Sequence, residues 1–427
     1  MRKTRPSIVE LPRHLDALMS ALQIKDPAPQ GLRHLSDEEW GQLLSLSDQM
    51  HVTIRLRELW GSDLPQWVAA RIERNLADNR ARFEEIKGTY HKVARCLGQD
   101  GVEHLVLKGF AQWPLLMQHP RDRMHSDLDI FCPPEQAEAA VQALARIGYR
   151  STRQTESFPS DQHLPTMVTQ SSWQWRGNLF DPEMPLPIDL HIRFWNEESC
   201  GFGATGLEAL WQRRTERSVD KVSFPALHQV DALGYSALHA LRHLLWDSLA
   251  LYHVYEVAWF LEYASSDADF WRLWEEWHDP SLRRLEAICF AVAKQWFQCR
   301  VPQVVEEEIT QLPVKVRDWL RTYSYSPLER LFSANKDSLW LHLSLLESRM
   351  AKSVLVRRRL FGAKMPPLAA FRGDVEPGAS QDRPGRKLAE RVKHIEYVAS
   401  RALYHARTLP PTVARGVRWW LGAGASS

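Results

Sequence analysis

The sequence of 427 residues lacks several features that define common classes of protein. No stretch approaches the roughly 18 uninterrupted apolar residues that cross a bilayer, and the basic start, residues 1–16, contains no apolar block typical of a signal peptide. The five cysteines form no C-x-x-C pair and are odd in number, which argues against a disulfide framework or a zinc knuckle. We therefore expect a cytoplasmic protein whose reduced thiols lie in the core.

An internal repeat is also absent, and so is a strong overall charge, since the net charge is +2. The charge is nevertheless uneven along the chain. Residues 349–427 contain sixteen basic and five acidic residues, so this tail carries +11 and the remaining chain carries −9. Such an asymmetry can mark a surface that meets phosphate, acidic lipid or another acidic partner. A solvated helix face is the alternative.

Helical patterns fill the first hundred residues, where Ser36 and Glu39 form a capping box before an amphipathic run. Three short apolar runs with residues suited to β-strands follow, at 103–109, 127–132 and 187–194. A short helix is expected after Gly109. Residues 133–149 begin with prolines and end near a glycine, which predicts a second helix. The order is strand, helix, strand, helix and further strands.

Residues 164–190 alternate in part, and Gly177-Asn178 offers a turn, so we predict a hairpin there. Long periodic apolar segments after residue 226 predict a helical bundle. A linker is expected over 365–387, followed by a final helix and a loose end at 419–427. The predicted division is a helical region (1–98), a sheet-containing core (99–225), a helical bundle (226–348) and a basic tail (349–427).

Asp127 and Asp129 lie two residues apart in a strand-like run, so both carboxylates project from the same face of the sheet. Two like charges so placed favour a divalent cation. Mg²⁺ takes hard oxygen ligands and bridges to substrate phosphates, which is how phosphoryl and nucleotidyl transfer is organised. The pair therefore predicts a metal site, with strand-end or surface positions as the alternative.

Asp189 is a third acid in a strand-like run, and strand pairing could bring it beside the other two. Three such acids suit two metal ions, with Asp127 and Asp129 binding both and Asp189 holding the one nearer the nucleophile or acting as general base. The alternative is that Asp189 pairs with Arg193, which lies on the same strand face.

Lys108 and Gly109 end the first predicted strand and open the next helix, a position where backbone N–H groups favour an anion. Lys108 and Arg123 are candidates to contact a triphosphate, because a guanidinium can bind phosphate oxygens at two points and an ammonium acts as a point charge. A salt bridge that orients Asp127 or Asp129 is the alternative role for Arg123.

Taken together, these motifs resemble those of the uncharacterised nucleotidyltransferase family within the polymerase-beta-like superfamily. The family pattern is a strand ending in L-K-G, an Arg four residues before D-[IL]-D, a helix closing with L-x-x-x-G-Y, and a later acid before L-H. The matching residues are Leu107, Lys108, Gly109, Arg123, Asp127, Asp129, Leu144, Gly148, Tyr149, Asp189, Leu190 and His191. The resemblance is strong over 105–194 and looser in the helical region up to Tyr263.

The resemblance implies an α+β fold, in which a small mixed sheet forms the nucleotidyltransferase core between N-terminal helices and a C-terminal helical bundle. It implies Asp127, Asp129 and Asp189 as catalytic metal ligands, with Mg²⁺ or Mn²⁺ as cofactor, and Lys108-Gly109 as the turn nearest the phosphates. The expected reaction moves an NMP from an NTP such as ATP to a hydroxyl of an unknown acceptor, a small molecule, tRNA or protein. A catalytically silent scaffold that binds a protein, RNA or membrane surface is the alternative.

His239, His243 and Asp247 recur every four residues and lie along one helix face. No H-E-x-x-H signature accompanies them, so a packed or hydrogen-bonded trio is favoured over a metal site. Most of the eighteen tryptophans are expected in the core and at interfaces, although Trp419-Trp420 beside Arg415 and Arg418 could touch a membrane or RNA surface.

Overall fold

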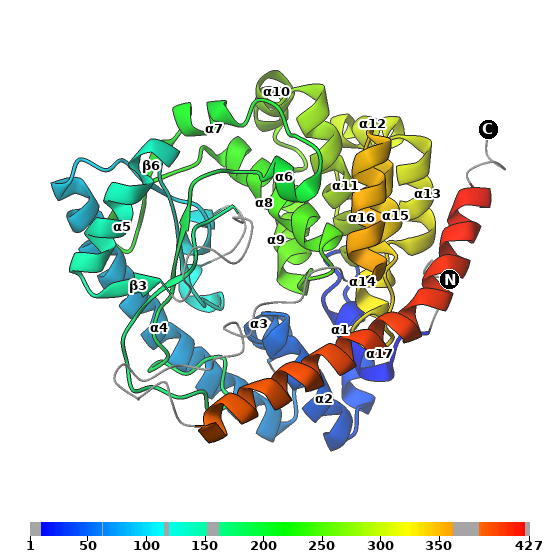
Figure 1. The fold of residues 1–427 in the computed structure, drawn as a ribbon, viewed down its shortest axis with the longest axis horizontal. Coiled ribbons are helices and arrows are strands. Elements are labelled where there is room, and N and C mark those ends of the chain that lie inside the picture. Colours follow the sequence, from blue (N-terminus) through cyan, green and yellow to red (C-terminus); the bar gives the residue numbers. More distant parts are fainter. Residues whose placement is uncertain (1–9, 62, 115–118, 152–161, 362–383, 423–427) are drawn as a thin grey trace. The chain divides into compact units, whose positions relative to one another are not determined.

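The computed structural model describes residues 10–61, 63–114, 119–151, 162–361 and 384–422. The described residues form two compact units: those from 10 to 312 belong to the larger one, and 313–361 and 384–422 form the smaller one. Figure 1 traces the elements in chain order. The helices of the larger unit are α1 (Arg13–Ala21), α2 (Asp37–Gln49), α3 (Thr53–Trp60), α4 (Gln66–Gln99), α5 (Ala137–Arg146), α6 (Glu197–Cys200), α7 (Glu208–Gln212), α8 (Gln229–Leu245), α9 (Leu251–Ala264), α10 (Ala268–Trp277), α11 (Pro280–Phe297) and α12 (Gln303–Gln311).

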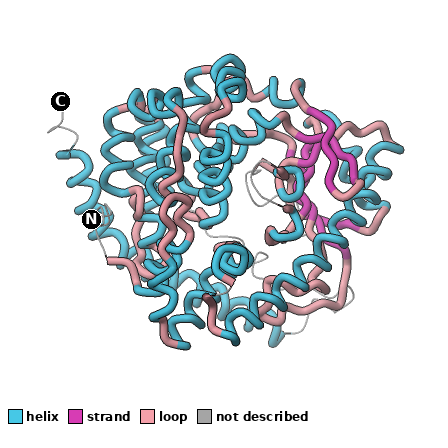
Figure 2. The backbone as a smooth tube through the Cα atoms, turned by 180° about the vertical axis from the view of Figure 1, so that it is seen from behind, coloured by secondary structure: helices cyan, strands magenta, loops and turns pink. Residues whose placement is uncertain are grey.

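One mixed sheet of seven strands lies in the larger unit, in the order β3-β4-β5-β2-β1-β7-β6. Figure 2 shows these strands gathered together with helices beside them. The strands are β1 (Leu105–Val106), β2 (Leu128–Phe131), β3 (Tyr149–Ser151), β4 (Met167–Thr169), β5 (Ile188–His191), β6 (Thr215–Val219) and β7 (Val222–Ala226). The predicted α+β class with a mixed sheet flanked by helices is confirmed.

The centre of the sheet is the parallel pair β2 and β5, in which Asp129 is the register partner of Asp189. Because strand side chains alternate between faces, Ile130 and Leu190 enter the apolar core on one side. The two aspartates therefore project from the opposite face. The predicted strands at 127–132 and 187–194 are confirmed, and their pairing brings together residues sixty positions apart.

The helices α4 and α5 cover the apolar face of the sheet. Phe83, Ile86 and Val93 of α4 share one buried cluster with Leu144 of α5 and Ile130 of β2. The α5 helix follows one turn of 3-10 helix, η4 (Pro134–Gln136), and ends before a glycine at φ +94°, as expected from the sequence. The capping box that begins α2 is also confirmed.

Two local predictions hold only in part. The hairpin expected over 164–190 is present as the antiparallel pair β4 and β5, with Met167 the register partner of Ile188, but residues 170–187 between them contain no strand, so Gly177-Asn178 is not a tight hairpin turn. The Asn178 side chain accepts a hydrogen bond from the Phe180 N–H and makes a local turn within this long connection. The helix expected after Gly109 is only a 3-10 turn, η2 (Gly109–Gln112), and residues 115–118 lie outside the described part.

A second hairpin was not foreseen from the sequence. β6 and β7 pair in antiparallel register from Thr215↔Ala226 to Val219↔Val222. The two turn residues, Asp220 and Lys221, have φ angles of 43° and 69°. Both values lie in the left-handed region that a two-residue hairpin turn requires. The parallel pairing of β7 with β1 then joins this hairpin to the rest of the sheet.

The smaller unit is helical in its described residues and contains α13 (Val314–Tyr323), α14 (Ser326–Glu329), α15 (Ser338–Leu345), α16 (Arg349–Phe361) and α17 (Pro384–Gly422). Arg415 of α17 pairs with Asp337 at 2.5 Å and with Glu329 at 3.3 Å. A Cβ at Gly416 would lie 2.3 Å from the Trp340 ring, so only glycine fits there.

These contacts correct two expectations about the tail. Residues 419–422 belong to α17 rather than to a loose end, and Trp419 is buried with its ring stacked 5.9 Å from Trp340. Arg415 and Trp419 are therefore internal, whereas Trp420 is exposed. Of the linker expected over 365–387, residues 365–383 lie outside the described part, and 384–387 begin α17.

Among the described residues, no helix combines the length and apolar character that crossing a membrane requires. The five cysteines are buried and unpaired, as expected. The predicted division of the chain into four segments, 1–98, 99–225, 226–348 and 349–427, stays a prediction.

Candidate active site

Three carboxylates predicted from the sequence meet on one face of the sheet. Asp127, Asp129 and Asp189 each offer an oxygen, and these oxygens all lie within 4.8 Å of one another. Asp127 precedes β2, Asp129 lies within it, and Asp189 lies on β5. The register of the parallel pair places Asp129 beside Asp189. Residues distant in sequence thus form a single acidic group.

Asp129 is the most tightly held of the three. Its Oδ1 lies 2.8 Å from Lys108 Nζ and 2.8 Å from His191 Nε2. Burial acts to raise the pKa of the Asp129 carboxyl, but Lys108 and His191 outweigh burial and hold the pKa below its ordinary value. Asp129 is therefore ionised at neutral pH.

His191 positions Asp129 from the neighbouring strand. Burial lowers the pKa of His191 to about 4, so its ring is neutral at pH 7 and donates from Nε2 to the carboxylate. Its Nδ1 is buried and has no hydrogen-bond partner among the described residues. A histidine bonded to a carboxylate in this way fixes the orientation of that carboxylate.

Asp127 has a different electrostatic environment. Burial, together with the nearby Asp129, raises the pKa of the Asp127 carboxyl to about 6. The Ser126 hydroxyl donates to Asp127 Oδ1 at 3.1 Å. Asp127 is thus the member of the group that a neighbouring cation would stabilise most.

Asp189 is oriented by the segment that leads into β4. The Thr166 hydroxyl donates to Asp189 Oδ1 at 2.6 Å, and His163 Nδ1 lies 3.8 Å from the same oxygen. Within the described residues no ion pair joins Asp189 to Arg193, so that alternative is not observed. Thr166 thus orients Oδ1 of Asp189 by a hydrogen bond, and the Asp189 side chain is half-buried.

The turn at Lys108-Gly109 follows β1 and precedes η2. Gly109 has a φ of +62°, which a residue with a side chain adopts only with strain. The η2 segment is too short to provide the helix dipole expected from the sequence. Lys108 points its ammonium to Asp129, and this ion pair keeps the pKa of Lys108 above its ordinary value against the effect of burial.

Arg123 lies beside the acidic group but pairs with another acid. Its Nε and Nη2 lie 2.6 Å and 3.3 Å from the two oxygens of Glu256 on α9. The guanidinium also lies 5.2 Å from the centroid of the Tyr252 ring. Among the described residues, the alternative salt bridge of Arg123 with Asp127 or Asp129 is therefore not observed, and Arg123 pairs with Glu256 instead.

Two polar residues of α4 hold the segment that leads into β2, and sequence reasoning missed both. Asn79 Nδ2 donates to the carbonyls of Arg121 and Arg123, and its Oδ1 accepts from the His125 N–H. Arg82, which is 1% exposed, donates to the carbonyls of His125, Ser126 and Met184. These bonds fix the approach to Asp127.

Tyr235 of α8 is a further residue that the sequence did not identify. Its hydroxyl is buried with no hydrogen-bond partner among the described residues, and it is near enough for Lys108 and Asp129 to affect it. Burial raises the pKa of Tyr235 to about 12. The hydroxyl is thus a protonated donor available beside the site.

The donor set fits a hard divalent cation. It consists of three carboxylates close together, one of which, Asp127, has a pKa raised by burial and by the like charge of Asp129. Oxygen ligands of this kind suit Mg²⁺ or Mn²⁺. Asp127, Asp129 and Asp189 would hold the ion, while His191 and Thr166 orient two of them.

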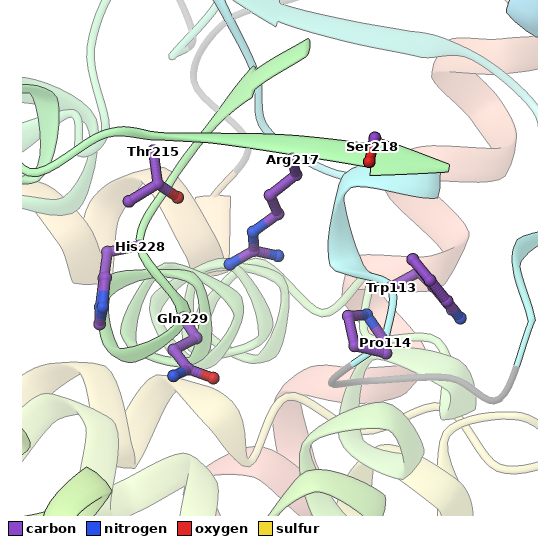
Figure 3. A pocket seen from close by; sticks show the side chains of 7 residues that line it. All are labelled: Trp113, Pro114, Thr215, Arg217, Ser218, His228 and Gln229. Atoms are coloured by element: carbon purple, nitrogen blue, oxygen red, sulfur yellow. The ribbon is translucent and has the colours of Figure 1, made fainter. Parts of the chain in front are cut away.

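A pocket of about 400 Å³ lies elsewhere in the same unit. Figure 3 shows the Arg217 side chain extending from β6 between His228 and Gln229 on one side and Trp113 and Pro114 on the other. The Arg217 guanidinium donates to the carbonyls of Ala111 and Leu227. None of the three carboxylates lines this pocket, so it is distinct from the acidic group.

Comparison with known families identifies one match within the chain. The model of a family described as "Uncharacterised nucleotidyltransferase" matches residues 36–298, which is more than half of the chain. The matched range includes the whole sheet, all three carboxylates and helices α8 and α9. No match was found among curated proteins or among solved structures.

Proposed function

Because the chain belongs to the uncharacterised nucleotidyltransferase family, we propose that it transfers the NMP group of an NTP to a hydroxyl of an acceptor and releases pyrophosphate. The observation that carries the proposal is the convergence of Asp127, Asp129 and Asp189 within 4.8 Å. Mg²⁺, or Mn²⁺ in its place, would supply positive charge to the phosphate oxygens when bound by these carboxylates.

In the proposed reaction the acceptor oxygen forms a bond to the α-phosphorus. The bond from that phosphorus to the oxygen bridging to the β-phosphorus breaks, and pyrophosphate leaves with the bonding electrons. Asp189 takes the proton of the acceptor hydroxyl, because it is half-buried and is held by Thr166 through one oxygen. Its second oxygen is then the general base.

The remaining residues hold and neutralise the reactants. His191 keeps Asp129 oriented, and Asn79 and Arg82 fix the backbone before Asp127. Lys108 at the Gly109 turn would exchange its bond to Asp129 for a triphosphate oxygen once another cation occupies the carboxylates. Arg123 is assigned to the nucleotide as well, with Glu256 holding its guanidinium in place.

The experiment measures binding of each of the four NTPs by calorimetry, with and without Mg²⁺, to the wild type and to Asp129→Asn. Asp220→Asn is the matched control, since Asp220 is exposed in the β6-β7 turn and asparagine tolerates its φ of 43°. We expect Mg²⁺-dependent binding of at least one NTP that Asp129→Asn loses and Asp220→Asn keeps. NTP labelled at the α-phosphate should then transfer label to an acceptor in a cell extract.

Absence of NTP binding by the folded wild type at millimolar Mg²⁺ would contradict the proposal. The catalytically silent scaffold would then be the better description. Binding that Asp129→Asn retains in full would remove the carboxylates from the proposed role.

A further inference from the structure

Three histidines form a second cluster of metal-ligating side chains in the larger unit. His239 and His243 lie one turn apart on α8, and His253 lies near the start of α9. One ring nitrogen from each lies within 4.8 Å of the others. The ring centroids are 4.5 to 4.9 Å apart. The sequence favoured a packed trio of His239, His243 and Asp247 over a metal site, and it did not identify His253, which lies on the next helix.

All three rings are in the neutral form that binds metals. Burial lowers the pKa of His239 and of His253 well below the ordinary value, and it lowers the pKa of His243 to about 3. Lys108 and Arg242 add to this effect for His239 and His243. A neutral imidazole binds a metal through its unprotonated nitrogen, so no proton has to be released to solvent at pH 7.

Two nitrogens of the cluster are buried without a hydrogen-bond partner in the described part of the chain. They are His239 Nδ1 and His253 Nε2. His243 Nδ1 lies 2.9 Å from the Ser248 hydroxyl, and its Nε2 accepts a hydrogen bond of 3.5 Å from Arg242 Nη2, which a metal ion bound at Nε2 would replace. A ring whose far nitrogen is hydrogen-bonded is the usual arrangement of a metal-binding histidine. Ordinary core histidines have both nitrogens satisfied, so packing alone does not account for this cluster.

We propose that His239, His243 and His253 bind a transition-metal ion that prefers imidazole ligands, Zn²⁺ in the first place, at a site separate from the three carboxylates. Nitrogen donors select such ions over Mg²⁺, whereas the carboxylates select Mg²⁺ or Mn²⁺. Three histidines leave one tetrahedral position open.

The surroundings determine what fills the open position. Arg242 Nη2 lies 3.5 Å from His243 Nε2, and Lys108 acts electrostatically on all three rings. These positive charges oppose a bare divalent ion, so the fourth ligand is anionic, such as hydroxide or a phosphate oxygen. His253 Nδ1 accepts from the Ala250 N–H at 3.3 Å. Binding through His253 Nε2 therefore requires that its proton move to Nδ1 and that this long bond be lost.

The test titrates the full chain with Co²⁺ and records the visible absorption bands of the metal. It is done in the Asp127→Asn/Asp129→Asn background, so its outcome does not depend on the proposed nucleotidyl transfer. His239→Asn and His253→Asn remove ligands, and His34→Asn is the control because His34 is exposed. The five buried cysteines are distinguished by the intense thiolate-to-cobalt band that sulfur ligands produce.

In the background protein and in the His34→Asn variant, we expect one equivalent of tetrahedral Co²⁺ that Zn²⁺ displaces and Mg²⁺ does not. The affinity for Co²⁺ should fall at least tenfold in His239→Asn and in His253→Asn. If those variants do not fold, X-ray absorption of the Zn²⁺-loaded background protein counts its imidazole ligands directly. A count below three, absence of a tetrahedral spectrum, or unchanged binding in folded His239→Asn would overturn the proposal.

Discussion

Lys108 Nζ lies 2.8 Å from Asp129 Oδ1, so a cation of the chain itself neutralises the acid at the centre of the carboxylate group. Lys108 comes from the turn after β1 and Asp129 from β2, which is the antiparallel neighbour of β1. The sheet thus places a largely buried ammonium beside the Asp129 carboxylate. Any metal ion that binds Asp129 competes with this ammonium.

The Lys108→Met variant separates the two roles of this lysine. Removing the ammonium should tighten Mn²⁺ binding by up to about tenfold, or 1.4 kcal/mol, because a competitor for Asp129 is lost. NTP binding should weaken, because a phosphate contact is lost. Electron paramagnetic resonance measures free Mn²⁺, and calorimetry measures the NTP. Lys92→Met, at an exposed position on α4, is the control. Weaker Mn²⁺ binding by Lys108→Met would contradict the idea that Lys108 and the metal ion compete for Asp129.

Arg82→Met should destabilise the larger unit by about 3 kcal/mol, because one buried and two partly buried carbonyls lose a charged donor. Mn²⁺ affinity should fall as well, since the segment before Asp127 is no longer held. Arg80→Met is the matched control on the same helix. Because Arg80 makes only an exposed ion pair with Asp122, we expect this change to alter the free energy of unfolding by no more than about 0.5 kcal/mol. Urea unfolding compares the two, and equal effects would show that Arg82 has no special role.

Metal binding should weaken at acidic pH because of Asp127, whose pKa is raised to about 6 by burial and by Asp129. A proton and a cation compete for this carboxylate, so Mn²⁺ affinity should fall up to about tenfold per pH unit below that value. In the metal-free chain the same raised pKa means that stability decreases as pH rises through about 6. Asp127→Asn should bind Mn²⁺ weakly and with little pH dependence between about pH 5 and 8; a dependence like that of the wild type would assign the proton to another group.

Stability should also depend on His278, which lies 2.8 Å from Glu286 and 3.2 Å from Asp231. Burial lowers its pKa, but the two acids outweigh burial and raise the pKa to about 9. The stabilisation is therefore complete below the unfolded value of about 6.5 and is lost as pH rises through about 9. Its size is roughly 3 kcal/mol.

The measurement for His278 is the free energy of unfolding in urea between about pH 6 and 10, for the wild type and His278→Gln. The difference between the two proteins should shrink toward high pH. His34→Gln, at an exposed position, controls for general effects of losing a histidine. A difference that stays constant over the range would show that His278 does not gain its proton on folding.

The sequence predicted the parts of the site that depend on short patterns. Asp127 and Asp129 alternate with apolar residues, and Asp189 lies in a similar run, so their common face followed from the geometry of strands. The helix over 137–146 had its own start and end signals. The family resemblance is confirmed by the match over 36–298.

Residues that act across the fold were not predictable in the same way. Asn79 and Arg82 look like members of the polar face of an amphipathic helix, and only the packing of α4 brings them to the carbonyls before β2. His253 has no spacing relationship to His239 along the chain. The β6-β7 hairpin was missed because its turn is Asp220-Lys221 rather than a glycine-containing pair.

The parallel pairing of Val106 on β1 with Ala226 on β7 has a consequence for the order in which the chain assembles. Because β7 lies more than a hundred residues beyond β1, the sheet cannot close while the chain is being synthesised until residue 226 has left the ribosome. Such long-range pairing makes folding slow. The strands that hold the three carboxylates, β2 and β5, can pair before this. Until β7 arrives, however, the open edge of β1 is exposed to chaperones and to other nascent chains.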